Sequence, residues 1–340
     1  MRPTPGENMT NPFFSVIVAT CRGDHPFVHH REWHVLDKIV ENLTKQSFRD
    51  FELIIVDLVW NFRKDYIKDK YSDVGFPILH VIDKDSVFRD LQLTRICSAK
   101  NTGIMYARGE HLIFSDDGQE WAADALSCLE KWARQGIGAT CRLHRDHGAG
   151  PVECDSRWKA YGLDDVVNTK VVNAAGIGYF GGTMSMCPTE NMLWCNGFDE
   201  MFDGSRQLED GDMCRRLDST GLNIALDGKP FIVEYDLSGC DNRVHRANTI
   251  SKCNGSYCYP VWKEHPKRVR ANDHLSTDDI LDTFMSNKCL VINNESRCTV
   301  SKTICPMKCN NRSLVNIYKD SRLLFNLADM RNSSPWSEKA

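Results

Sequence analysis

The sequence has no long hydrophobic run and little net charge, and both absences exclude classes of protein. No stretch approaches the roughly 20 apolar residues that a membrane-spanning helix needs, and residues 1–11 lack the apolar core of a secretory signal peptide. The formal net charge is −4 over 340 residues, which gives no general attraction to nucleic acid or to an anionic membrane. We therefore expect a soluble, intracellular protein of the cytoplasm.

A disulfide framework is not indicated either, although the chain has 15 cysteines. Their number is odd, and six fall in otherwise regular elements: Cys21, Cys97, Cys128, Cys141, Cys187 and Cys214. Most are expected to be reduced and to pack as small hydrophobic residues. The chain is long enough for one large core and a smaller appendage.

Apolar runs of strand length alternate with helical patterns in the first third of the chain. Phe13 to Thr20, Phe51 to Asp57 and Ile78 to Asp83 are such runs, and His111 to Phe114 is a fourth. A helical pattern over Trp33 to Leu43 separates the first two. Uninterrupted apolar strands are typical of a sheet covered on both faces. We predict an α/β fold whose crossover connections bring the strand ends to one edge.

Acidic residues follow three of these strands: Asp57, Asp83 and the pair Asp116 and Asp117. The carboxyl ends of strands in an open α/β sheet border its ligand crevice. An adjacent carboxylate pair there is suited to hold a divalent cation against a phosphate. The alternative is a polar turn that caps the strand.

The helix before that pair carries a stripe of mostly small residues: Ile96, Ala99, Gly103 and Ala107. Such a stripe lets a helix lie close on a sheet. Lys100 and Asn101 sit beside the stripe, and we expect both to face the crevice.

Two motifs in the second half suggest further site residues. Gly181 and Gly182 are expected either to let the backbone approach a ligand or to form a tight turn. Leu208 to Leu217 is predicted to be a helix whose positive N-terminal end favours an ionised Asp210, although Glu209 and Asp210 fit equally well as charges of a first helical turn.

The remaining segments of the second half are less regular. Ala122 to Gln135 is predicted to be a helix, Arg142 to Lys170 a flexible flap, and Lys229 to Tyr235 a last strand. Asn196 to Phe202 is predicted to be a turn anchored by two phenylalanines. We divide the chain into a disordered lead (1–12), one domain (13–236) and a C-terminal extension (237–340).

Taken together, these motifs resemble the family 2 glycosyltransferases of the GT-A fold. The resemblance covers about Phe14 to Val233 and runs through FFSVIVAT, FELIIVD, SAKNTGIMYARGEHLIFSDDG, GGTMSMCPTENMLWCNGFDEMF and EDGDMCRRL. It implies a Rossmann-like mixed sheet sandwiched by helices, a nucleoside-diphosphate sugar donor, a UDP-sugar for preference, and Mn²⁺ or Mg²⁺. It further implies transfer of a hexose or similar sugar to an acceptor hydroxyl with inversion at the anomeric carbon.

The resemblance also implies roles for individual residues. Asp210 is the expected general base, with Glu209 as its neighbour. Asp116 and Asp117 are the expected metal ligands. The expected donor contacts are Thr20, Arg22, Asp57, Asp83, Lys100, Asn101, Asp116, Gly181 and Gly182. The chain departs from the family pattern at Gly118, where a further acid is usual, and at Leu58 to Trp60.

Past residue 236 the resemblance fades. His245 is a candidate metal or diphosphate ligand from a closing loop. Lys263 to Arg270 is a basic cluster, either solvated or suited to bind a phosphorylated acceptor or nucleic acid. Four cysteines could form a structural zinc site or could remain unlinked thiols: Cys289, Cys298, Cys305 and Cys309. Leu314 to Met330 is predicted to be a helix whose leucines, Leu327 among them, dock on the main body.

Two other functions stay open. A nucleotidyltransferase on a similar sheet would make sugar nucleotides, and a non-catalytic protein would only bind nucleotide sugars or carbohydrate. The acceptor class is open as well and includes glycans, lipids, proteins and nucleic-acid bases.

Overall fold

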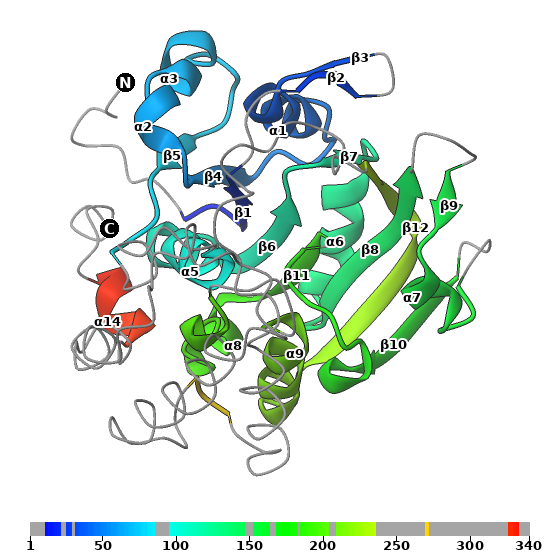
Figure 1. The fold of residues 1–340 in the computed structure, drawn as a ribbon. Coiled ribbons are helices and arrows are strands. Elements are labelled where there is room, and N and C mark those ends of the chain that lie inside the picture. Colours follow the sequence, from blue (N-terminus) through cyan, green and yellow to red (C-terminus); the bar gives the residue numbers. More distant parts are fainter. Residues whose placement is uncertain are drawn as a thin grey trace, which may run out of the picture.

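A central β-sheet with helices on both faces organises the chain (Figure 1). The computed structural model describes residues 11–21, 25–28, 31–85, 95–146, 152–163, 168–182, 184–203, 209–235, 269–271 and 326–332. Within them the strand order along the sheet is β10-β12-β8-β11-β6-β1-β4-β5, with β7 paired to β12 and β9 to β8. The α/β prediction is confirmed.

The first half of the sheet is parallel, as predicted. Its strands are β1 (Phe14–Thr20), β4 (Phe51–Asp57), β5 (Ile78–Val81) and β6 (His111–Asp116). β1 pairs in parallel with both β4 and β6, and β4 pairs in parallel with β5. The carboxyl ends of all four strands therefore lie along one edge of the sheet, where the sequence predicts the acidic residues to lie.

The second half makes the sheet mixed. Its strands are β7 (Gln119–Trp121), β8 (Gly138–Asp146), β9 (Glu153–Cys154), β10 (Thr169–Asn173), β11 (Ser185–Pro188) and β12 (Asn223–Tyr235). β11 runs antiparallel to β6 and β8, whereas β12 runs parallel to β8. A separate two-stranded sheet joins β2 (His25–Val28) and β3 (Arg31–Trp33).

Two sequence predictions are wrong here. The predicted flap begins with residues that continue β8 through Asp146 and ends on β10, and β9 pairs back onto β8. The last strand begins at Asn223 instead of Lys229, because β12 passes through the turn-like residues 227–231 with a shift in register between Asp227 and Phe231. A strand with such an irregularity reads in sequence as a turn followed by a shorter strand.

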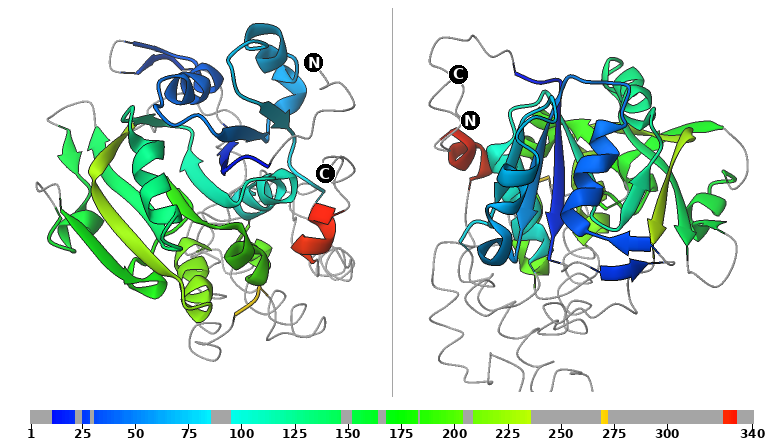
Figure 2. Two further views of the ribbon diagram at one scale, coloured as in Figure 1. Left: turned by 180° about the vertical axis from the view of Figure 1, so that it is seen from behind. Right: turned by 90° about the horizontal axis from the view of Figure 1, so that it is seen from above.

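Helices cover both faces of the sheet (Figure 2). The longer helices are α1 (Val35–Thr44), α5 (Ile96–Tyr106), α6 (Ala125–Ala133) and α9 (Glu209–Ser219). The short ones are α2 (Trp60–Arg63), α3 (Tyr66–Lys70), α7 (Ser156–Lys159), α8 (Thr189–Trp194), α14 (Leu327–Asn332), η1 (Ala174–Gly176) and η2 (Glu200–Phe202). The chain moves from β1 outward to β4 and β5 and then returns through α5 to β6 on the other side of β1. Strand order reverses between β1 and β6, which is where open α/β sheets form their ligand crevice.

α5 lies unusually close to the sheet, as its small-residue stripe predicts. A Cβ at Gly103 would lie only 2.3 Å from Cγ2 of Ile17. The N-terminus of α5 is capped from far along the chain, because the carboxylate of Asp203 accepts hydrogen bonds from the backbone N–H groups of Cys97 (2.8 Å) and Ser98 (3.0 Å). Leu327 of α14 is fully buried in the core, and α14 packs on α5. The hydrogen bonds to Asp203 thus hold the N-terminus of α5, and α14 packs against the same helix.

The eight cysteines in the described residues are thiols and form no disulfide. Among the helices that the structure describes, none combines the length and apolarity needed to cross a membrane.

Candidate active site

Polar side chains gather where β1, β4 and β6 end. Thr20 pairs in register with Asp57, and Ala19 pairs with Asp116, so the three strand ends are level. Asp83 follows β5 by two residues and is also buried. The predicted convergence of acidic residues at one edge is present in the structure.

Lys100 is the centre of the site. Its side chain is 5% exposed, and its Nζ lies 3.3 Å from Oδ1 of Asp210 and 4.8 Å from the ring centroid of Phe198. Burial by itself opposes the charged form, but the carboxylates of Asp210, Glu209 and Asp116 outweigh burial and raise the pKa of Lys100. Lys100 therefore carries its positive charge at neutral pH and links the end of β6 to the start of α9.

The two acids at the start of α9 have different surroundings. Glu209 is 9% exposed, and burial together with the neighbouring charge of Asp210 raises the pKa of its carboxyl to about 7, although Lys100 acts in the opposite direction. The side chain of Asp210 is 30% exposed. Asp210 is thus the carboxylate that an incoming molecule can reach, and Glu209 lies behind it.

The two glycines approach side chains of this site closely. Gly181 has a φ of +120°, and a Cβ there would lie 2.9 Å from both Nζ of Lys100 and Cζ of Phe198. A Cβ on Gly182 would lie 2.9 Å from Oδ2 of Asp116. The carbonyl of Gly182 accepts a hydrogen bond from the backbone N–H of Asp116 (3.3 Å). Residues 181–182 therefore lie directly over Lys100 and Asp116.

Asp116 and Asp117 differ in their contacts. Asp117 is 5% exposed and accepts a 2.5 Å hydrogen bond from the hydroxyl of Thr20. Asp116 is half-buried next to Gly182. No group of three or more histidine, cysteine or acidic side chains able to hold a metal occurs in the part of the chain that the structure describes. The carboxylate of Asp116 nevertheless fits a cation such as Mg²⁺, which proteins often hold by one or two carboxylates plus substrate phosphates.

Asp57 and Asp83 are occupied by partners that the sequence did not reveal. Asp57 is fully buried and accepts hydrogen bonds from Arg63 (2.6 and 3.0 Å), from His80 (2.9 Å) and from the backbone N–H of Val59 (2.9 Å). Burial raises its pKa, but His80 and Arg63 outweigh it, so the pKa is lowered.

Asp83 likewise pairs with Arg95, at 2.6 Å. Both carboxylates therefore form ion pairs that stabilise the ends of β4 and β5. The side chain of Arg63 is 13% exposed and lies between Asp57 and the surface.

Asn101 holds the loop that carries Phe198. Its amide donates to the carbonyl of Phe198 and to Oε1 of Glu200, both at 2.9 Å, and its carbonyl accepts from the N–H of Phe198 at 2.8 Å. Asn101 is fully buried. It positions the aromatic wall beside Lys100, and both Phe198 and Phe202 are buried as predicted.

Several expected site residues lie outside the described residues. These are Arg22, His245 and the four cysteines considered for zinc, Cys289, Cys298, Cys305 and Cys309. The basic cluster Lys263 to Arg270 is described only from residue 269.

Comparisons with known proteins give no match among families and curated sequences, and remote matches among solved structures. No protein-family model and no curated protein matches the chain. Among solved structures, S. aureus TarS 1–349 matches with a TM-score of 0.48 and 13% identity over 91% of this chain and 91% of that chain. The same protein in complex with UDP matches with a TM-score of 0.46 and 13% identity over 93% of this chain and 73% of that chain. GalNAc-T7 with UDP, GalNAc and Mn²⁺ matches with a TM-score of 0.46 and 13% identity over 68% of this chain and 44% of that chain. Likenesses this remote do not place the chain in a family.

Proposed function

We propose that the chain is a glycosyltransferase of the GT-A fold, similar to family 2, that transfers a sugar from a nucleoside diphosphate, UDP for preference, to an acceptor hydroxyl. The observation that carries the proposal is the ammonium of Lys100, 3.3 Å from Asp210 and in electrostatic contact with Asp116 and Glu209. It brings together a cation for the diphosphate and a reachable carboxylate for the acceptor.

Asp210 is the proposed general base. In the proposed step its carboxylate takes the proton of the acceptor hydroxyl as the oxygen bonds to the anomeric carbon. The bond from that carbon to the phosphate oxygen breaks, and the diphosphate leaves with the electron pair. A single displacement, in which the acceptor oxygen attacks from the face opposite the leaving group, implies inversion.

The departing diphosphate needs positive charge near its oxygens. Lys100 provides a fixed, largely dehydrated ammonium for this purpose, and displacement of Asp210 from Lys100 by the donor would free the base. Asp116, with Asp117 behind it, would hold a divalent cation, Mn²⁺ or Mg²⁺, which when bound supplies further charge neutralisation. Asp117 is the less available of the two because Thr20 already donates to it.

The decisive experiment is incubation of the purified full chain with UDP-sugars, with and without Mn²⁺, followed by analysis of the nucleotide released. Release of UDP supports glycosyl transfer. In a parallel incubation with a nucleoside triphosphate and a sugar 1-phosphate, release of pyrophosphate would instead identify a nucleotidyltransferase. Binding of a UDP-sugar with neither donor hydrolysis nor transfer to any acceptor hydroxyl supplied would favour the non-catalytic alternative.

A further inference from the structure

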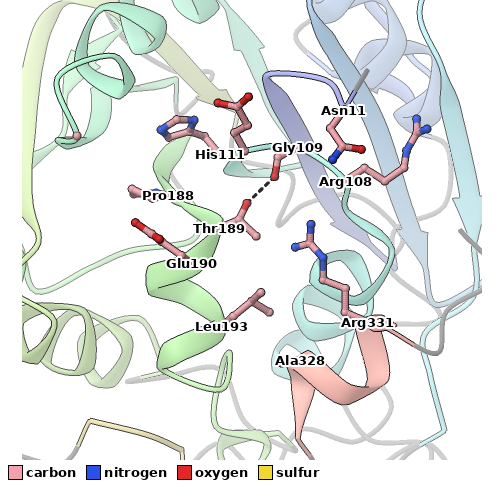
Figure 3. Close-up of a pocket in the computed structure, with 12 residues that line it drawn as sticks. Asn11, Arg108, Gly109, His111, Pro188, Thr189, Glu190, Leu193, Ala328 and Arg331 are labelled. Carbon is pink, nitrogen blue, oxygen red and sulfur yellow. Dashed lines mark hydrogen bonds between the residues drawn. The ribbon is translucent and has the colours of Figure 1, made fainter. Parts of the chain in front are cut away.

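A cavity lies at the opposite edge of the sheet from Asp116. It has a volume of about 680 Å³ and lies where β6 begins and β11 ends, between α8 and α14 (Figure 3). Five residue steps of β6 separate its wall at His111 from Asp116, or about 17 Å at a rise of about 3.3 Å per residue. A cavity of this size suits a small organic molecule. It is distinct from the candidate active site.

One wall of the cavity is basic. Arg108 and Arg331 both line it, and Figure 3 shows the guanidinium of Arg331 projecting from α14 toward the cavity between Arg108 and Leu193. Arg108 is already held by Glu52, with contacts of 2.7 and 2.9 Å. The Nη1 of Arg331 is buried and has no hydrogen-bond partner among the described residues. A half-buried guanidinium that lines a cavity and has an unused donor favours an anionic ligand.

Among the described residues, Glu52 only partly offsets the charge on Arg331. Its carboxylate acts to raise the pKa of Arg331, but burial outweighs it and the pKa is lowered. Two acids line the cavity. Glu110 directly precedes β6, and Glu190 belongs to α8, which lies across the cavity from Arg331 in Figure 3. An anion would therefore be held at the α14 end.

The rest of the lining is partly apolar, with contributions from Pro188, Leu193 and Ala328. We propose that the cavity binds a small organic anion whose carboxylate or phosphate accepts hydrogen bonds from Arg331 while its apolar part packs on Leu193, Pro188 and Ala328.

The test is ¹⁹F NMR titration of the full chain with 4-fluorobenzoate, 4-fluorophenyl phosphate and the neutral 4-fluorobenzyl alcohol. At least one anion should bind more tightly than the alcohol, and the tighter of the two assigns the anionic group as carboxylate or phosphate. The Arg331→Met protein should bind it about tenfold more weakly, the value expected for a lost charge-assisted hydrogen bond. Arg215→Met, which changes an exposed arginine of α9, should bind like the wild type.

Two further measurements separate location from folding. Ala328→Phe keeps Arg331 and fills the cavity, so it should also weaken anion binding even if Arg331→Met disturbs α14. UDP should not displace the bound anion. Failure of both anions to bind, equal binding of the alcohol, undiminished binding by Arg331→Met, or displacement by UDP would each overturn the proposal, whatever the outcome of the glycosyl-transfer assay.

Discussion

The ammonium of Lys100 lies 3.3 Å from the carboxylate of Asp210, although 110 positions separate the two residues in the sequence. The contact joins α5, which packs on β1 and β4, to the first turn of α9. It places a buried positive charge between the acids at the end of β6 and Asp210 of α9, whose side chain is 30% exposed.

Replacing Asp210 with asparagine should abolish transfer and leave donor affinity within a few fold of wild type. The change removes the proposed base, whose contribution to such reactions is about 100-fold or more, and keeps the size of the side chain. Turnover with UDP-sugar and UDP affinity should be measured on the same preparations. Asp218→Asn, at the other end of α9, is the matched control. Normal turnover by Asp210→Asn would remove Asp210 as the base.

Replacing Lys100 with methionine should move the acid limb of the pH–rate profile to higher pH. Lys100 holds down the pKa of Glu209, so loss of its charge should raise the pKa of that carboxyl further. Glu209 adjoins the proposed base Asp210, so protonation of Glu209 should slow transfer over a wider range at low pH. Lys100→Arg keeps the charge and should keep the limb near its wild-type position. An unchanged profile in Lys100→Met would show that Lys100 does not act on these acids.

Asp116→Asn should reduce Mn²⁺-stimulated UDP binding more than Asp117→Asn does. Asp116 is the more exposed of the two, whereas Asp117 is tied to the hydroxyl of Thr20. Isothermal calorimetry of UDP with and without Mn²⁺ measures the difference directly. Metal stimulation that survives in Asp116→Asn would contradict the assignment of this residue to the cation.

The edge of the sheet that holds the site could be predicted from the sequence. Apolar strand runs followed by Asp57 and by Asp116 are local patterns, and β4 has the predicted bounds of Phe51 to Asp57. The parallel pairing of these strands follows from the intervening helices. The strand ends and the acids that follow them therefore needed no tertiary information.

The partners of those acids could not be predicted. Arg63 neutralises Asp57, His80 forms a hydrogen bond with Asp57, and Arg95 neutralises Asp83, through contacts that carry no periodic signal. Sequence reasoning missed Phe198 as the wall beside Lys100 as well, because its place depends on the hydrogen bonds of Asn101. The only available hint for the role of Arg63 was its position six residues after Asp57 in the sequence.

Gly181→Ala should destabilise the protein more than Gly136→Ala does. Both glycines have positive φ, +120° and +68°, so both substitutions carry a backbone cost of about 1 kcal/mol or more. The space around Gly136 is open, whereas a Cβ at Gly181 would meet Lys100 and Phe198 at 2.9 Å. Urea denaturation of the two variants measures the difference, to which the close contacts of Gly181 and its less favourable backbone region both contribute. Equal losses would show that residues 181–182 do not lie tightly over Lys100.

Glu209→Gln should change how stability depends on pH. The ordinary pKa of glutamate, 4.5, is raised to about 7 in the folded protein, so between these values the folded state binds more protons than the unfolded state. Stability therefore falls as pH rises from 4.5 to 7, by about 3 kcal/mol for this one group. The glutamine variant lacks this loss, so its stability relative to wild type should increase over that interval. Chemical denaturation at several pH values measures the difference, with the exposed Glu153→Gln of β9 as control. A difference between wild type and Glu209→Gln that stays constant across pH 4.5 to 7 would mean that Glu209 is not held in a buried, acid-rich environment behind Asp210.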